Sequence, residues 1–174
     1  MVRSEKFAKE SAVVMTEMVL PNDTNTLNNL MGGKLMHWMD IVSAISAQKH
    51  ANSIVVTASV DNVSFGKPIQ LGNVVTLKAQ VTRAFNSSME VHIEVYAEDI
   101  PAGKKIESNR AFFTFVAVDE HGKPKKVPQL IPETAEEKAL FESALERREL
   151  RLVLAKRMQP HHATALKSIF EEKK

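Results

Sequence analysis

Two neighbouring segments in the middle of the chain alternate apolar and polar residues. In residues 74–85 the apolar positions are Val75, Leu77, Ala79 and Val81. In residues 88–99 they are Met89, Val91, Ile93, Val95 and Ala97. Because successive side chains of a strand point to opposite faces, this period predicts two strands that each bury one face. Asn86 and Ser87, which stand between the segments, predict a hairpin turn.

Three further segments predict strands. They are AVVMTEMVL at residues 12–20, SIVVTASVDNVSF at residues 53–65 and RAFFTFVAVD at residues 110–119. All three are rich in apolar, β-branched or aromatic residues, and the last is apolar almost throughout, which is typical of a strand covered on both faces. Because mostly short turns join the strands after residue 53, we predict an antiparallel sheet.

A long helix is predicted between the first two of these strands. From residue 33 to residue 50, apolar residues recur at intervals of three and four, at Leu35, Met39, Val42 and Ile45. Other apolar residues fill the remaining faces, and a helix that is apolar nearly all round belongs inside a structure. We therefore predict an α+β fold in which an antiparallel sheet wraps around one central helix.

The composition changes after Pro132. Residues 133–158 are rich in strong helix formers, with an apolar stripe at Leu140, Ala144, Leu150 and Leu154. We predict a core domain at residues 1–132 and a helical extension at residues 133–174. The long helix of the extension either covers its own domain or contacts another subunit, and the tail after it either forms another short helix or frays.

Composition and charge exclude several classes of protein. The 174 residues contain no cysteine, which excludes disulfides and thiolate metal sites, and the net charge of +2 is spread evenly over the chain, which argues against nucleic-acid binding. No apolar run approaches the ~20 residues that cross a membrane, and the N-terminus lacks a secretory signal. We expect a cytoplasmic protein that is not embedded in a membrane. The adjacent His161 and His162 lack further ligands, so we predict no metal site.

One carboxylate, Asp40, stands inside the apolar helix. Residues 35–47, LMHWMDIVSAISA, contain no other charged residue. The helix is preceded by Gly32 and Gly33 and by the polar run PNDTNTLNN, which contains Asn25. From the residues alone, the polar run could be merely a turn, and an aspartate in a helix could simply face solvent.

Four stretches together resemble the acyl-CoA hydrolase branch of the hotdog thioesterases: PNDTN, LMGGKLMHWMD, TASVDNVSFGKPIQLGNVVTLKAQV and SSMEVHIEV. The resemblance implies a hotdog fold and the hydrolysis of acyl-CoA to a free fatty acid and coenzyme A, with no metal or redox cofactor. It also implies that Asn25 and Asp40 form the catalytic pair. In double hotdogs of this family the two residues come from different hotdog units, so the resemblance implies that in a chain with one unit they should come from different subunits. We therefore expect a dimer or a trimer of dimers with shared active sites.

Simple chemistry is compatible with these roles. Asp40 would act as general base or nucleophile, and Asn25 would orient the water or the thioester carbonyl. The N–H groups near Gly32 and Gly33 would form the oxyanion hole, because amides of the first helical turn lack intrahelical partners. By resemblance, the contacts with coenzyme A would come from Phe65, Lys67, Asn86, Ser87, Ser88 and Arg110.

Two alternative functions stay open. A non-catalytic acyl-CoA-binding hotdog protein, acting as a sensor or scaffold, would keep the fold without the chemistry. A hotdog dehydratase would use His37 as its base, although a partly buried structural histidine is the simpler interpretation of that residue. Asn28 stands where many relatives carry glycine, which leaves the detailed conformation of this loop open.

Overall fold

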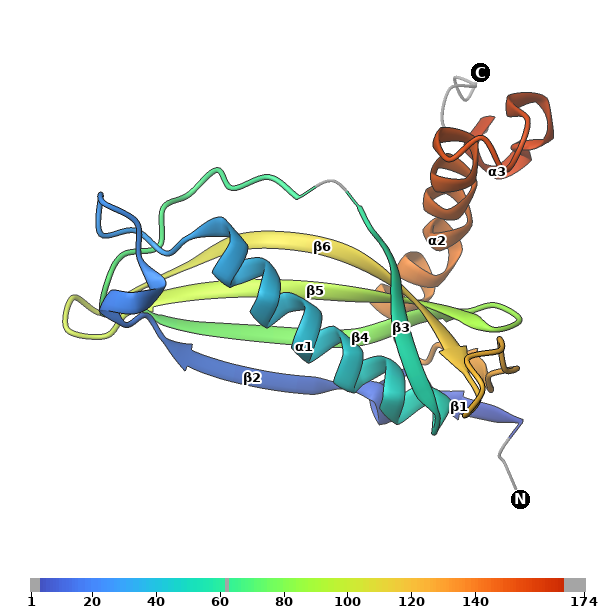
Figure 1. Cartoon of the computed structure of the whole chain (residues 1–174), viewed down its shortest axis with the longest axis horizontal. Coiled ribbons are helices and arrows are strands. Elements are labelled where there is room, and N and C mark those ends of the chain that lie inside the picture. Colours follow the sequence, from blue (N-terminus) through green and yellow to red (C-terminus); the bar gives the residue numbers. More distant parts are fainter. Residues whose placement is uncertain (1–3, 62, 168–174) are drawn as a thin grey trace. The chain divides into compact units, whose positions relative to one another are not determined.

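Figure 1 shows a computed structural model, which describes residues 4–61 and 63–167. The chain divides into two units, Met1–Ile131 and Pro132–Lys174.

The first unit contains a five-stranded antiparallel sheet with the strand order β2-β4-β5-β6-β3. The strands are β2 (Val13–Met18), β3 (Ile54–Val60), β4 (Val74–Ala84), β5 (Ser88–Asp99) and β6 (Lys104–Val118). The sheet curls around one long helix, α1 (Gly32–Ala51), as Figure 1 shows. This arrangement confirms the α+β hotdog architecture expected from the sequence.

The alternation that predicts β4 and β5 matches their burial. All nine apolar positions of the two segments are buried, and the strands pair with Leu77 opposite Val95. A bulge between Val81 and Arg83 then shifts the register. Near this bulge, Glu90 is fully buried although its position in the alternation predicts the polar face, and one of its carboxylate oxygens accepts a hydrogen bond from the Thr82 hydroxyl at 2.8 Å.

Two strands differ in length from the sequence prediction. β6 begins at Lys104 rather than at residue 110, because it pairs along β5 as far as Asp99. β3 ends at Val60 rather than at residue 65. β3 lies at one edge of the sheet and β4 lies next to the other edge, so residues 61–73 must cross between them and do not form a short turn.

Two short strands, β1 (Glu5–Phe7) and β7 (Gln129–Ile131), pair in parallel and were not predicted. Three residues are too few to show a period in sequence. Short 3₁₀ helices, η1 (Ala8–Ser11) and η2 (Pro21–Asp23), flank β2. At the C-terminal end of α1, His50 is fully buried with Nε2 2.9 Å from the Pro128 carbonyl oxygen, and burial lowers the pKa of His50.

One face of α1 stays open in the single chain. Leu35, Met39 and Val42 are buried, as the periodicity predicts. Ile45 belongs to the same apolar set but is 42% exposed, and Ile41 is exposed as well. The sheet of one chain therefore does not cover the helix all round.

The second unit contains α2 (Ala135–Leu154), η3 (Pro160–His162) and α3 (Thr164–Lys167). Thr134 caps α2: its hydroxyl accepts a hydrogen bond from the N–H of Glu137, whose carboxylate accepts one from the N–H of Thr134. In the predicted apolar stripe Ala144 is buried, whereas Leu150 and Leu154 are exposed.

α3 is the short helix considered for the tail, and residues 168–174 of that tail lie outside the described residues. His161 and His162 are exposed. Across residues 4–61 and 63–167, no cluster of His, Asp and Glu has the arrangement of a metal site. In the same part of the chain, no helix combines the length and the apolar character needed to span a membrane.

Candidate active site

Asp40 lies half-buried on the third turn of α1, and a residue of the next strand holds its carboxylate. The hydroxyl of Thr57 donates a hydrogen bond to Oδ1 of Asp40 at 2.7 Å. Thr57 belongs to β3, the edge strand beside α1 (Figure 1). With Oδ1 engaged, Oδ2 is the oxygen left for a water or a substrate. Sequence reasoning missed Thr57, although it belongs to the TASVDNVSF stretch that carries the family resemblance.

Asn25 lies in a small hairpin, residues 24–30, between η2 and α1. The hairpin is closed by an antiparallel bridge and by a hydrogen bond from the Asn25 N–H to the Asn29 carbonyl at 2.9 Å. The side-chain oxygen of Asn25 accepts the N–H groups of Leu27 at 2.9 Å and Asn29 at 3.2 Å. Two N–H donors fix which end of the amide is the oxygen. The NH₂ end of Asn25 therefore points away from the hairpin backbone and can act as a donor.

Asn28 adopts the left-handed conformation, with φ at 57°. Glycine reaches this region without strain, and asparagine is among the few other residues that tolerate it, so Asn28 can adopt this conformation in the hairpin. The carbonyl of Asn28 accepts the Leu71 N–H at 2.9 Å, and the Leu30 N–H donates to the Ile69 carbonyl at 2.7 Å. These bonds attach the hairpin to the segment that leads into β4.

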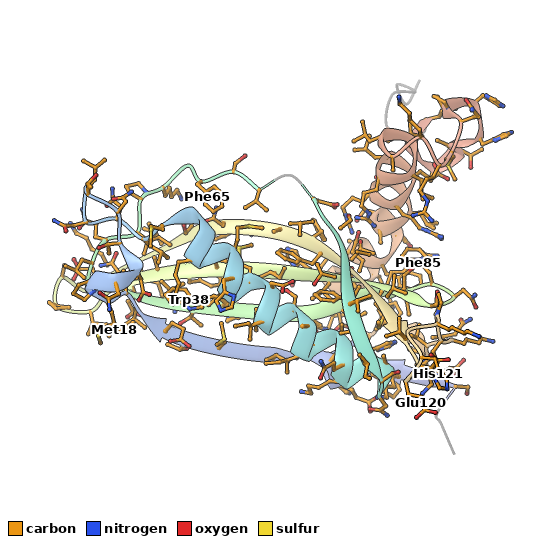
Figure 2. All side chains as sticks on the ribbon, in the orientation of Figure 1. Met18, Trp38, Phe65, Phe85, Glu120 and His121 are labelled. Atoms are coloured by element: carbon orange, nitrogen blue, oxygen red, sulfur yellow. The ribbon has the colours of Figure 1, made fainter. Side chains whose placement is uncertain are left out.

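Gly32 and Gly33 open α1, and no side chain caps this end of the helix. Among the described residues, the N–H groups of both glycines have no hydrogen-bond acceptor. The ring of Phe65 lies over Gly32, since a Cβ added there would be 3.6 Å from the ring, and a Cβ added at Gly33 would meet no atom within 4 Å. Figure 2 shows Phe65 above the start of α1. Gly33 thus borders open space, and an aromatic ring lies against Gly32.

Lys67 and Arg110, two of the predicted coenzyme A contacts, meet at one glutamate. The Lys67 ammonium donates to the Glu107 carbonyl at 2.9 Å, and the Arg110 guanidinium donates to the Glu107 carboxylate. Hydrogen bonding with Arg110 lowers the pKa of Glu107, and the same bond raises the pKa of Arg110. Arg110 also lies 4.0 Å from the Glu94 carboxylate, so nearby carboxylates balance its charge.

Asn86, Ser87 and Ser88 lie at the β4–β5 turn, far from this pair within one chain. Ser88 begins β5, whereas Arg110 pairs with Glu94, six residues further along the same strand. At ~3.3 Å per residue that separation is about 20 Å. The six residues expected to contact coenzyme A therefore do not converge on one place in the single chain.

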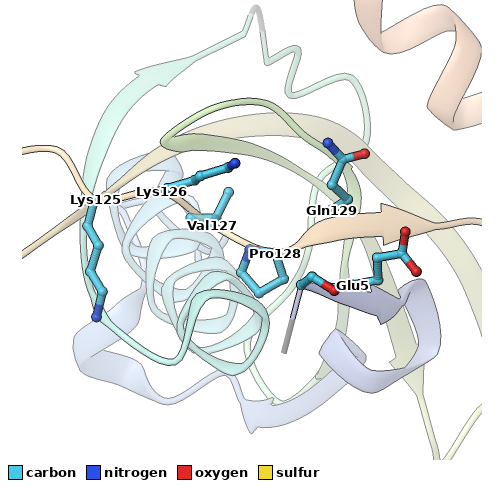
Figure 3. A pocket seen from close by; sticks show the side chains of 7 residues that line it. Glu5, Lys125, Lys126, Val127, Pro128 and Gln129 are labelled. Carbon is cyan, nitrogen blue, oxygen red and sulfur yellow. The ribbon is translucent and has the colours of Figure 1, made fainter. Parts of the chain in front are cut away.

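Two further features lie outside this group of residues. His37 is exposed on α1, where the sequence interpretation favoured partial burial. A surface pocket lies beside β1 and β7 (Figure 3), and no predicted site residue lines it; its lining residues are Ser4, Glu5, Lys125, Lys126, Val127, Pro128 and Gln129.

Comparison with known proteins relates the chain to enzymes of one chemistry. Residues 27–104 match the family described as the thioesterase superfamily. The chain is 46% identical over 142 residues to the uncharacterized acyl-CoA thioester hydrolase YkhA of Bacillus subtilis (strain 168), a match that covers 82% of this chain and 83% of that protein. It is 38% identical over 130 residues to the cytosolic acyl coenzyme A thioester hydrolase of Mus musculus, covering 74% of this chain and 34% of that protein.

Solved structures give the same picture. A hexameric acyl-CoA thioesterase in its apo form superposes with a TM-score of 0.85 at 42% identity, over 87% of this chain and 97% of that one. The acyl-CoA hydrolase of Staphylococcus aureus, in complex with butyryl coenzyme A, coenzyme A and coenzyme A disulfide, has a TM-score of 0.80 at 40% identity, over 87% of this chain and 94% of that one. Other structures of the S. aureus protein carry alanine in place of one asparagine, one aspartate or one threonine.

Proposed function

This chain belongs to the thioesterase superfamily, and from that premise we propose that it hydrolyses acyl-CoA at a site that includes Asn25, Asp40 and Thr57. The observation that carries the proposal is the 2.7 Å hydrogen bond from Thr57 to Asp40. In the S. aureus protein the altered aspartate follows the altered asparagine by 15 positions and precedes the altered threonine by 17. Asn25, Asp40 and Thr57 have the same spacing here, which supports treating them as one group.

Asp40 supplies the group that starts the reaction. A thioester carbonyl is a good electrophile, so hydrolysis mainly needs an activated water or a nucleophile. Thr57 holds Oδ1 of Asp40, which leaves Oδ2 either to take a proton from water or to attack the carbonyl itself. A protein that only binds acyl-CoA gains nothing from a carboxylate held in this way, so the bond favours catalysis over the sensor or scaffold alternative.

Hydrogen-bond donors near the start of α1 can stabilise the negative charge that develops on the thioester carbonyl oxygen. The N–H groups of Gly32 and Gly33 point out of the first turn, where the helix dipole favours negative charge. Preorganised donors of this kind stabilise an oxyanion in the transition state. The NH₂ group of Asn25 is a further donor, and we assign it to orienting the carbonyl oxygen or the attacking water. Neither role calls for a metal or a redox cofactor.

We propose that the chain assembles through the face of α1 and β3 that is left open. Ile41 and Ile45 on α1 and Val56 on β3 are exposed, and β3 is an edge strand whose outer side has no neighbour in the sheet. A two-fold dimer that pairs these faces would cover the apolar residues and close the sheet edge. It would also bring the Asn25 hairpin of one chain to Asp40 of the other. The predicted coenzyme A contacts, which are spread over one chain, would then come together between chains. The assembly is either a dimer or a trimer of dimers.

The second unit, residues 132–174, gives a testable prediction about assembly. α2 exposes Leu150 and Leu154, apolar residues that a neighbouring subunit could cover. Ending the chain after Pro132 is therefore expected to lower the oligomeric mass measured by light scattering. An unchanged mass would instead mean that α2 takes no part in assembly and only covers its own chain.

A thiol-release assay tests the proposed activity directly. The purified protein is expected to release coenzyme A from at least one member of a series from acetyl-CoA to palmitoyl-CoA, and the activity should persist in a metal chelator. The same series gives the preferred acyl-chain length. Binding of coenzyme A without hydrolysis of any member would overturn the proposal in favour of the sensor or scaffold. We further propose a cytoplasmic location, by analogy with the cytosolic relative of Mus musculus.

A further inference from the structure

A buried carboxylate that the proposed mechanism does not use lies at the base of the Asn25 hairpin. Asp23 is only 7% exposed. Its Oδ2 accepts the Leu20 N–H at 3.0 Å, just past the end of β2. Its Oδ1 lies 3.0 Å from the ammonium of Lys34, which belongs to the first turn of α1. One carboxylate therefore joins the end of a strand to the start of a helix.

The backbone of Asp23 strengthens the same junction. Its carbonyl accepts the N–H of Met31, the residue immediately before α1, at 2.9 Å. Its N–H donates to the Leu20 carbonyl, also at 2.9 Å. The chain thus leaves Asp23, forms the hairpin that carries Asn25, and returns to Asp23 just before Gly32.

Lys34 is itself held from two sides. Besides pairing with Asp23, its ammonium lies 5.5 Å from the centroid of the Trp38 ring, one turn further along α1. Trp38 is 5% exposed, so this ring is a rigid support. The Leu20 N–H, followed by the Lys34 ammonium, lowers the pKa of Asp23. The carboxylate therefore stays ionised near neutral pH, where hydrogen bonds to a charged acceptor are stronger than those between neutral groups.

We propose that Asp23 is a positioning residue, which together with Lys34 holds the Asn25 hairpin in one orientation relative to the amides of Gly32 and Gly33. The inference rests on the proposed function and adds a residue that acts through others. Asn25 follows Asp23 by two positions, and Lys34 follows Gly32 by two, so the ion pair closes the segment that contains all the proposed donors. In the proposed shared site, Asn25 of one subunit acts together with Asp40 of the partner subunit. A change at Asp23 should therefore lower activity at the site that contains the altered chain's own Asn25 and the partner's Asp40.

Single substitutions test the positioning role. Asp23→Ala and Lys34→Met are expected to lower kcat by about 10- to 100-fold with little change in KM, since small displacements of positioned groups have effects of this size. Lys34→Arg should keep most of the kcat that Lys34→Met loses, because a guanidinium can also pair with the Asp23 carboxylate. Asp119→Ala is the matched control: Asp119 accepts two backbone N–H groups at 2.9 Å in the turn after β6, outside the Asn25 hairpin and the start of α1.

The kcat values of these variants show whether Asp23 positions the Asn25 hairpin or only contributes to the stability of the fold. Wild-type kcat in Asp23→Ala overturns the proposal. An equal loss in Asp119→Ala overturns it as well, because any loosened turn would then have the same effect. Thermal unfolding of the variants shows whether they fold to a similar extent.

Mixed dimers show on which site Asp23 acts. Refolding Asp23→Ala together with Asp40→Ala is expected to recover about a quarter of wild-type activity, because half the dimers are mixed and each mixed dimer has one intact site. Refolding Asp23→Ala with Asn25→Ala should recover none, because both proposed sites of each mixed dimer then have a damaged hairpin. The reverse pattern means that Asp23 acts on its own chain's Asp40 and overturns the inference.

A reference mixture separates this inference from the proposed function. If Asn25→Ala and Asp40→Ala complement each other but Asp23→Ala complements neither, then Asp23 serves only the fold and the inference fails. If the reference mixture itself does not recover activity, the shared site fails and the action of Asp23 across subunits fails with it. The comparison of kcat between Lys34→Arg and Lys34→Met would then still decide whether the ion pair positions Asn25 within one chain: a higher kcat in Lys34→Arg supports that role, and equal values exclude it.

Discussion

Replacing Asp40 by asparagine is expected to lower the rate of acyl-CoA hydrolysis by about 10²- to 10⁴-fold, the usual cost of losing a general base. Asparagine has nearly the same shape, and its oxygen can still accept the Thr57 hydroxyl that now lies 2.7 Å from Oδ1. It cannot take up a proton or attack a carbonyl as a carboxylate does. The fold and the affinity for coenzyme A should therefore stay nearly unchanged while turnover is lost.

Turnover by thiol release, circular dichroism and coenzyme A binding together check this prediction. His37→Ala is the control, because His37 is exposed on the same helix and should matter much less. An equal loss at His37 would favour the arrangement of a hotdog dehydratase. Thr57→Val should give a smaller loss than Asp40→Asn, since it frees the carboxylate without removing it. Turnover of Asp40→Asn within a few-fold of wild type would exclude the assigned role.

Mixing two inactive variants is expected to restore activity if each active site is shared between subunits. Asn25→Ala and Asp40→Ala should each be nearly inactive alone. Along α1, the hairpin and Asp40 are separated by ~10 Å at 1.5 Å per residue, which is far for both to reach one thioester within a chain. Two helices that pack antiparallel about a two-fold axis instead bring the hairpin of one chain to Asp40 of the other.

The expected size of the recovery follows from symmetry. After the variants are unfolded and refolded together, about half the dimers are mixed, and each has one fully mutated and one intact site. About a quarter of wild-type activity should return. Native mass spectrometry counts the mixed dimers, and their presence without any activity would mean that both residues act within one chain or that one of them is wrongly assigned.

The sequence is most informative where local periodicity and tertiary environment agree. The period of two in β4 and β5 predicts their buried faces, because a sheet that covers a helix has one dry side along its whole length. The same reasoning is wrong for Glu90, which is buried on the face expected to be polar. Periodicity shows which side chains share a face, but it does not show what covers that face.

The family resemblance and the isolated charge single out Asp40 in the sequence, and the PNDTN motif singles out Asn25. Their roles stay predictions that the proposed experiments test. The conformation of Asn28 could not be read from its neighbours, because the left-handed φ of 57° depends on how the hairpin closes and attaches to the segment before β4.

By itself, the sequence determined the order of the main elements, the antiparallel sheet around a central helix and the carboxylate that stands out within that helix. Tertiary structure alone decided that Thr57 meets Asp40 across 17 positions and that Asp23 pairs with Lys34. It also decided that Ile45 is left exposed on a helix with apolar residues on nearly every face. The physical reason is that hydrophobic period is a local property of the chain, whereas a hydrogen bond or an uncovered face depends on where the sheet curls and where it ends.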